Sequence, residues 1–174
     1  MGQQTLAVPQ LADDFRKSLR GLASTVSLLT TEDGGERYGM VATAVMSVTL
    51  HPPALIVGIN RSASIHDAVV RRGWYGVNLL ARHQEAVSRH FATYSRSERF
   101  AVGNWVDQGV TSAPEVRIPV LADALAVICC RVREVIPYGT HNLFLATVEQ
   151  VRLAAEAEPL VYCDGGFGSF SRSS

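Results

Sequence analysis

The side chains best suited to bind an anion lie in a short turn at 60–64, Asn-Arg-Ser-Ala-Ser, between an apolar run and a helix-forming segment. A helix start presents unpaired N–H groups and a partial positive charge. The hydroxyls of Ser62 and Ser64 and the guanidinium of Arg61 could complete an anion cradle there. This pattern favours a phosphate site, although a plain helix cap at Ser64 with a solvated Arg61 explains the same residues.

Two further places carry side chains that could touch a ligand. Ser47 and Thr49 flank Val48 at strand spacing, so both hydroxyls are expected on one face. They could bond the polyol or ring edge of a cofactor, or belong to an ordinary half-exposed strand. His141 follows a turn and begins a strand. Histidine can orient a ligand or shuttle protons near neutral pH, but an isolated one at a strand end is often simply exposed.

Metal and hydrolytic chemistry have no support in the spacing of the residues. No HExxH, GxSxG or Walker A pattern occurs, and no GxGxxG follows a strand-like run. The three cysteines contain no CxxC pair, and we interpret them as buried structural thiols. We therefore expect no metal, and no dinucleotide-binding domain to hold a nicotinamide cofactor.

The elements that must position these side chains are mostly strands. Residues 10–22 have the apolar spacing of a helix, 24–31 favour a strand, and 32–35 favour a hairpin turn. Residues 38–50 form the returning strand or strand pair, with small residues that allow a backbone or ligand to approach closely. Prolines at 52–53 separate them from a strand at 54–60 and a helix from Ser64 to about 72, with Asp67 as a capping-box partner.

The second half of the chain is likewise predicted to be mostly strands. Strands are predicted at 74–80, 120–135, 142–153 and 160–163, a helix at 82–92, and a turn at 137–139. Residues 93–119 hold charges, glycines and prolines and are predicted to form a long loop. Many strands with few short helices predict an antiparallel barrel with helices at its ends.

Composition narrows the class of protein. The chain has 174 residues, 47% of them hydrophobic, with 16 basic and 16 acidic residues. Zero net charge argues against nucleic-acid binding and makes self-association easy. The longest apolar runs fall short of a membrane span, and the N-terminal residues do not form a signal peptide, so a cytoplasmic location is expected.

Taken in order, these segments resemble the flavin reductase family, the small reductase partners of two-component flavin monooxygenases. The most specific match is GMVATAVMSVTLHPPALIVGIN with RSASIH at 39–66. Weaker matches are ASTVSLLTT, VNLLARHQEAVSRHFA, PVLADALAVICCRV, GTHNLFLATVEQV and PLVYCDGGFG. The resemblance implies a mainly β fold, the antiparallel FMN-binding split barrel with Greek-key connections and a few short helices. It also implies one domain over 1–174, with a core at about 12–168.

The resemblance also implies a site. The isoalloxazine ring would lie against 44–49, and the ribityl phosphate end would lie at Thr43 and the 60–64 turn. His141 would sit near the nicotinamide, and Tyr162 near the same region. The cofactor-binding residues are then Thr43, Ala44, Ser47, Val48, Thr49, Asn60, Arg61, Ser62, Ser64, His141 and Tyr162. Thr140 stands where the family usually has Asp, which puts nicotinamide preference in question.

The activity implied is hydride transfer from NADH or NADPH to FMN or FAD. Reduced flavin would then diffuse to a flavin-dependent monooxygenase. A homodimer is expected, with residues 93–119 near its interface. Two alternatives stay open: a flavoenzyme that retains its flavin and acts on an organic substrate, and a non-enzymatic flavin-binding or partner-interaction protein.

Overall fold

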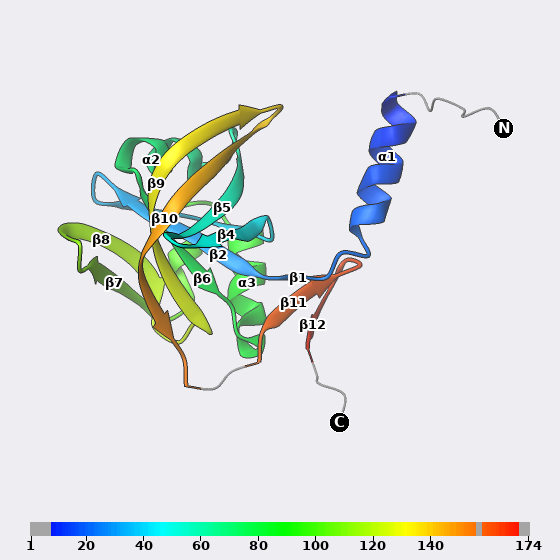
Figure 1. The fold of residues 1–174 in the computed structure, drawn as a ribbon. Helices are drawn as coiled ribbons and strands as arrows, with labels where there is room; N and C mark the ends of the chain where they lie inside the picture. The colour runs from blue at the N-terminus through cyan, green and yellow to red at the C-terminus, as the bar shows by residue number, and fades with distance from the viewer. Residues whose placement is uncertain (1–7, 156–157, 171–174) are drawn as a thin grey trace.

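Antiparallel strands dominate the structure, which confirms the predicted mainly β fold with a few short helices. The computed structural model describes residues 8–155 and 158–170 (Figure 1). Its helices are α1 (Val8–Leu19), α2 (His66–Arg72) and α3 (Glu85–Thr93), with 3-10 turns η1 (Arg82–Gln84) and η2 (Arg99–Ala101). Its strands are β1 (Ser24–Thr25), β2 (Ser27–Asp33), β3 (Glu36–Ala42), β4 (Val45–Leu50), β5 (Pro53–Asn60), β6 (Trp74–Leu79), β7 (Trp105–Val110), β8 (Ala113–Leu121), β9 (Ala126–Tyr138), β10 (His141–Leu153), β11 (Leu160–Cys163) and β12 (Gly166–Ser169).

The body of the molecule is a seven-stranded sheet in the order β3-β2-β6-β9-β10-β5-β4. Its edge strands β3 and β4 are joined by Thr43 and Ala44 alone. Each residue spans at most about 3.6 Å, so the sheet must curl until its two edges meet. The carbonyl of Ala44 accepts a hydrogen bond from the Gly58 N–H of β5 at 3.1 Å, at this closure. The sequence segment 38–50 is therefore a strand pair whose members lie at opposite edges.

Both faces of β2 are buried. Leu28 belongs to a core cluster with Phe91 of α3 and Ile118 of β8. Its neighbour Leu29 points into a second cluster that includes Val69 of α2. Successive side chains along a strand point to opposite faces, so β2 contributes side chains to both core clusters. Helices α2 and α3 are thereby fixed on different sides of the sheet.

A small three-stranded sheet, in the order β1-β11-β12, lies beside the barrel. Figure 1 shows α1 extending from this sheet away from the barrel. Leu11 and Phe15 of α1 are consequently exposed, at 57% and 62%. In the described part of the chain, no helix is long and apolar enough to cross a membrane.

The prediction of a long loop at 93–119 is wrong for most of its length. The segment contains η2 and a two-stranded hairpin formed by β7 and most of β8. Charged residues on the exposed face of this hairpin interrupt the pattern of apolar residues that would have indicated strands. Pro119 lies within β8, opposite Asp107, and a hairpin outside the main sheet tolerates a proline that a central strand would not.

Three smaller predictions also need correction. Helix α2 begins at His66, and its N-cap is Ile65 with no side-chain cap bond, so Ser64 is not the cap. The predicted strand at 120–135 is divided, because β8 ends at Leu121 and β9 begins at Ala126. The predicted turn at 137–139 comes later, because β9 runs to Tyr138.

The cysteines are mostly as expected. Cys129 and Cys130 are buried, whereas Cys163 is exposed. Burial raises the pKa of the Cys129 thiol to about 11. This thiol is therefore protonated at neutral pH, as befits a structural residue.

Candidate functional site

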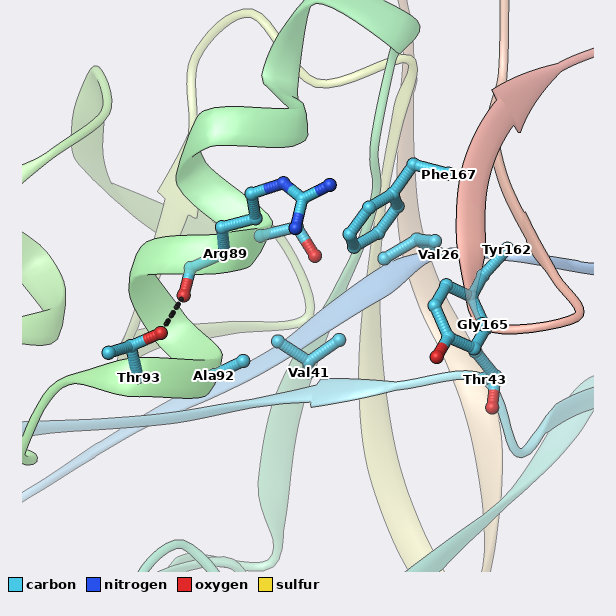
Figure 2. A pocket seen from close by; sticks show the side chains of 10 residues that line it. Val26, Val41, Thr43, Arg89, Ala92, Thr93, Tyr162, Gly165 and Phe167 are labelled. Carbon is cyan, nitrogen blue, oxygen red and sulfur yellow. Dashed lines mark hydrogen bonds between the residues drawn. The ribbon is translucent and has the colours of Figure 1, made fainter.

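A cavity of about 460 Å3 lies between α3 and the β11–β12 hairpin. Figure 2 shows Arg89 and Thr93 on one side and Tyr162 and Phe167 on the other, with Val41 between them. The rings of Tyr162 and Phe167 meet edge to face with centroids 5.3 Å apart, and the Arg89 guanidinium lies 4.8 Å from the Phe167 centroid. Flat aromatic and aliphatic walls of this kind suit a planar ligand.

A second cavity, of about 570 Å3, continues the first. Both are lined by Val41 and Ala92, and the second extends to the turn at 62–64. We call the two cavities together the α3 groove. The groove brings the 62–64 turn together with Thr43 and Tyr162, which line its first cavity. Four of the residues predicted for a cofactor site, Thr43, Ser62, Ser64 and Tyr162, thus share one surface.

The cations of the second cavity come from the segment after α3. Arg96 and Arg99 line the second cavity, opposite the 62–64 turn. One Arg99 nitrogen donates to the Gly39 carbonyl at 2.7 Å and lies 3.4 Å from the Ser64 hydroxyl oxygen. Two guanidinium groups beside serine hydroxyls form a site for a phosphate or another anion.

Arg61, the cation predicted for this cradle, is engaged elsewhere. Its guanidinium donates to the Gly139 carbonyl at 2.5 Å, and its backbone N–H donates to the Thr140 carbonyl at 3.0 Å. The Asn60 side chain accepts from both the N–H and the hydroxyl of Ser62, at 3.0 and 2.9 Å. Asn60 and Arg61 therefore shape the turn and anchor it to the β9–β10 hairpin, and neither lines the α3 groove.

The close seating of α3 depends on a glycine in β3. A Cβ atom at Gly39 would lie 2.7 Å from Cε1 of Phe91 and 3.2 Å from Cζ of Phe100. Any larger residue would push α3 and η2 outward. At this position the small residue admits the side chains of Phe91 and Phe100, whereas the prediction for 38–50 was close approach of a backbone or a ligand.

Ser88 marks the inner wall of the groove. This α3 residue is 1% exposed and lines the first cavity, yet its hydroxyl has no hydrogen-bond partner among the described residues. A buried hydroxyl without a partner costs about 1–3 kcal/mol. A ligand that offers a polar edge at this wall would remove that cost, so the wall fits a planar ring with heteroatoms at its rim.

His141 lies at the other side of the 60–64 turn, where it pairs with Asn60 across β10 and β5. The hydroxyl oxygen of Thr140 is 2.9 Å from Nδ1 of His141. An oxygen beside this ring nitrogen can fix the orientation of the imidazole. The structure does not bring His141 and Tyr162 together, because His141 adjoins the turn at the arginine end and Tyr162 lines the first cavity.

The segment 44–49 is placed differently from the rest of the predicted site. Ser47, Val48 and Thr49 are exposed on the edge strand β4, and none of them lines the α3 groove. A register shift between Ser47 and Thr49 breaks the alternation at Val48, so the two hydroxyls do not face one way as strand spacing predicts. The Thr49 hydroxyl instead accepts the His51 N–H at 3.1 Å. Ala44, at the barrel closure, adjoins Thr43.

Sequence reasoning missed the contribution of α3 and the segment after it. Residues 82–92 were predicted to be a helix and 93–119 a loop, but Ser88, Arg89, Arg96 and Arg99 were assigned no role. One feature of the sequence did point to this contribution. Ser88 is a polar residue one turn before Phe91, on the buried face of the helix. In the described ranges, no group of three histidine, cysteine or carboxylate residues could hold a metal ion.

The family model described as "Flavin reductase like domain" matches residues 19–171. An FMN reductase (NADH) RutF from Pseudomonas syringae is 44% identical over 157 residues, covering 90% of this chain and 84% of the relative. Another FMN reductase (NADH) RutF, from Agrobacterium fabrum, is 38% identical and covers 91% of this chain and 88% of the relative.

Solved structures agree with the sequence relatives. The NADH:FAD oxidoreductase SgcE6 of Streptomyces globisporus, in complex with NAD and FAD fragments, superposes with a TM-score of 0.83 at 25% identity, over 97% of this chain and 98% of that one. The flavin reductase PheA2 superposes with a TM-score of 0.78 at 28% identity, over 92% and 98%. The predicted split-barrel fold is confirmed by these neighbours.

Proposed function

Because the chain belongs to the flavin reductase like domain family, we propose that it transfers a hydride from NADH to FMN. The hydride leaves C4 of the reduced nicotinamide and adds to N5 of the flavin, and a proton from solvent completes the reduced flavin. The observation that carries the proposal is the α3 groove, with planar walls at one end and two guanidinium groups at the other. The relatives named above as NADH-dependent FMN reductases support the choice of NADH and FMN over NADPH and FAD.

The groove matches the two ends of FMN. We assign the isoalloxazine ring to the first cavity, against Tyr162 and near Thr43 and Ala44, with the Ser88 hydroxyl as a partner for the polar rim of the ring. The phosphate belongs in the second cavity, near Arg96 and Arg99. Ser47, Val48 and Thr49 would then not touch the flavin ring that is bound by their own chain.

The protein's own task is to bind and orient, since both reacting atoms belong to its ligands. We assign His141 to the sugar-phosphate part of NADH near the 60–64 turn, with the Thr140 hydroxyl holding the imidazole, because the nicotinamide ring itself must reach the flavin ring in the first cavity. We place Tyr162 against the rings. The exposed Arg89 and Thr93 at the rim leave the first cavity open to solvent, which suits a flavin that exchanges. Release of reduced flavin to a flavin-dependent monooxygenase follows as the proposed physiological step.

We also propose a homodimer. The exposed apolar face of α1 and the zero net charge both favour self-association. Light scattering coupled to size exclusion would report a dimer for the wild type and a monomer for Phe15→Glu. The involvement of residues 93–119 in the interface stays a prediction.

Anaerobic stopped-flow absorbance with NADH or NADPH and FMN or FAD tests the reductase assignment. We expect bleaching of added flavin by NADH, with many turnovers per protein. Flavin that survives purification without turnover of added flavin would instead favour the flavoenzyme that retains its cofactor. Binding without any bleaching would reject an enzymatic role.

A further inference from the structure

The two walls of the first cavity differ in polarity. The α3 wall carries Ser88 and Arg89, whereas the facing wall, from the β11–β12 hairpin, carries the rings of Tyr162 and Phe167 (Figure 2). The isoalloxazine ring has a similar asymmetry, with nitrogens and carbonyl oxygens on its pyrimidine edge and methyl groups on its benzene edge. Polar atoms that leave water need hydrogen-bond partners, so the pyrimidine edge belongs against α3.

Among the described residues that line this cavity, Arg89 is the one charged side chain. Its guanidinium lies 4.8 Å from the centroid of the Phe167 ring. Its Nε and Nη2 atoms each lie 2.8 Å from one carboxylate oxygen of Glu85, one helical turn earlier. The Nη1 group takes no part in this ion pair and can donate to a ligand. An aromatic ring and a carboxylate thus hold the cation at the cavity.

Reduction changes the charge of the flavin at its pyrimidine edge. The hydride from NADH carries two electrons and a proton to N5, and the ring then bears a negative charge at N1 and the C2 carbonyl oxygen until a solvent proton neutralises N1. A guanidinium beside this edge stabilises the charge by electrostatic attraction and hydrogen bonding. The oxidised ring is neutral and gains less from the same contact.

We propose that Arg89 stabilises the reduced flavin ring and so raises the reduction potential of bound FMN. The inference rests on the proposed function, because it takes the ring to lie in the first cavity. Glu85 opposes the effect, since its negative charge lies against the same guanidinium. The Arg89–Glu85 pair then sets how strongly the chain holds reduced FMN before release.

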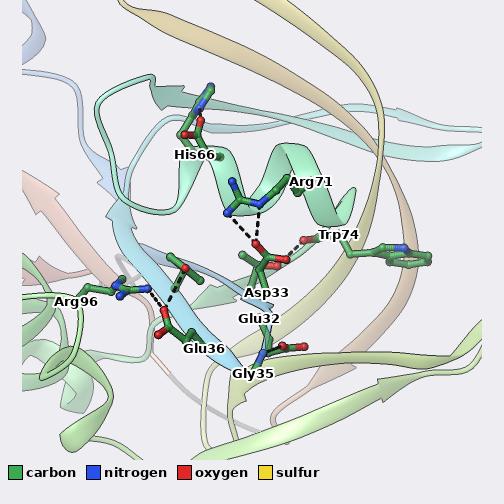
Figure 3. A network of polar contacts seen from close by, with 11 residues as sticks. Glu32, Asp33, Gly35, Glu36, His66, Arg71, Trp74 and Arg96 are labelled. Atoms are coloured by element: carbon green, nitrogen blue, oxygen red, sulfur yellow. Dashed lines mark hydrogen bonds and ion pairs between the residues drawn. The ribbon is translucent and has the colours of Figure 1, made fainter.

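The arginines at the other end of the groove act on a charge that reduction leaves unchanged. Arg96 lines the second cavity, where we place the phosphate, and Figure 3 shows it beside Glu36, with which it forms an ion pair. The phosphate has the same charge in oxidised and reduced FMN. Arg96→Gln should therefore weaken the binding of both forms by the same factor and leave the potential of bound FMN unchanged.

The test compares the dissociation constants of oxidised and chemically reduced FMN, without oxygen and at a pH where reduced FMN is an anion. Arg89→Gln should raise the constant for reduced FMN about tenfold more than that for oxidised FMN, which lowers the potential of the bound couple by about 30 mV. Arg89→Lys keeps a cation and should retain most of the wild-type potential. Arg82→Gln is the matched control, because that guanidinium pairs with Glu158 and does not line the cavity.

Glu85→Gln should shift the potential in the opposite direction. Removing the carboxylate leaves the Arg89 charge uncompensated, so reduced FMN should bind about threefold more tightly relative to oxidised FMN. This ratio corresponds to a rise of about 15 mV. A role of the ion pair in the stability of α3 alone would not give shifts of opposite sign in Arg89→Gln and Glu85→Gln.

The potential is measured by chemical reduction, so this result does not depend on NADH. Normal reduction of FMN by NADH, with the wild-type potential retained in Arg89→Gln, would overturn the inference alone. A wild-type protein that binds FMN without oxidising NADH, and whose potential falls in Arg89→Gln, would overturn the proposed function alone. An equal fall in Arg96→Gln would contradict the assignment of the ring to the first cavity, and the role of Arg89 with it.

Discussion

Asn78 in the barrel and Ser88 in the groove wall are both buried polar residues, but they differ in their partners. Asn78 on β6 donates to the Leu28 carbonyl and the Thr30 hydroxyl, each at 3.0 Å, and accepts the Leu121 N–H at 2.9 Å. Ser88 has no partner in the described chain. The first residue joins three strands, whereas the second presents an unused hydroxyl to a cavity.

The difference separates residues that hold the fold from residues available to a ligand. A fully bonded polar group in a core makes its neighbours dependent on it. An unbonded one lowers stability unless a ligand or a water molecule pairs with it. Substitution in the barrel should therefore lower the free energy of unfolding, whereas substitution in the groove wall should weaken ligand binding.

Asn78→Leu should have the largest effect on stability. The substitution keeps the volume but leaves the Leu121 N–H without its acceptor and removes the side-chain donor to the Leu28 carbonyl and the Thr30 hydroxyl. We expect a loss of about 3 kcal/mol in the free energy of unfolding, from the penalty for several unsatisfied groups. Urea denaturation measures it, with the exposed Asn104→Leu as control. A loss below about 1 kcal/mol would contradict the assignment of Asn78 as a residue that holds the fold together.

Gly39→Ala tests the boundary between the two regions. The new Cβ would meet Phe91 at 2.7 Å, so we expect about 2 kcal/mol of destabilisation from overpacking. Because Phe91 belongs to α3, the groove should widen and the dissociation constant for FMN should rise. Gly168→Ala is the matched control, since a Cβ there meets nothing within 4 Å. Lost stability with unchanged FMN affinity would show that the groove does not depend on how closely α3 is seated.

Ser88→Ala and Ser27→Ala form the closest test of the comparison. Both serines are 1% exposed and both hydroxyls lack partners in the described chain, but only Ser88 lines the groove. We expect Ser88→Ala to weaken FMN binding about tenfold, the value of one hydrogen bond to the ring. Neither variant should lose stability, because each removes an unpaired polar group. Flavin fluorescence titration and thermal unfolding measure the two effects, and equal FMN affinity in both variants would contradict the role of Ser88.

Local patterns predicted the barrel strands and the 62–64 turn. Runs of β-branched and apolar residues located β2, β5 and β6, and the Gly34-Gly35 hairpin turn was confirmed with positive φ at both positions. These features depend on neighbours in the sequence. The β7–β8 hairpin was missed because charges, glycines and prolines interrupt its apolar residues.

The remaining features depend on contacts between distant segments. No sequence pattern near Thr43 indicates that β3 and β4 lie at opposite edges of one sheet. That closure carries Ser47 onto an outer edge and leaves Thr43 in the groove. Arg96 and Arg99 likewise line one cavity with the 62–64 turn although they lie more than 30 residues away in the sequence, so their role could not be seen from spacing.

Ser64→Ala and Ser47→Ala decide between the groove and the edge strand as the place of the flavin. The Ser64 hydroxyl oxygen faces Arg99 at 3.4 Å, and its proton is free to reach a phosphate. Its loss should raise the dissociation constant of FMN about threefold, at the low end for one hydrogen bond, and leave that of riboflavin unchanged because riboflavin lacks the phosphate. Ser47→Ala should change neither, since Ser47 lies outside the groove. If Ser47→Ala weakened both ligands instead, the ring would lie along β4, as the family resemblance implies, and the first cavity would need another occupant.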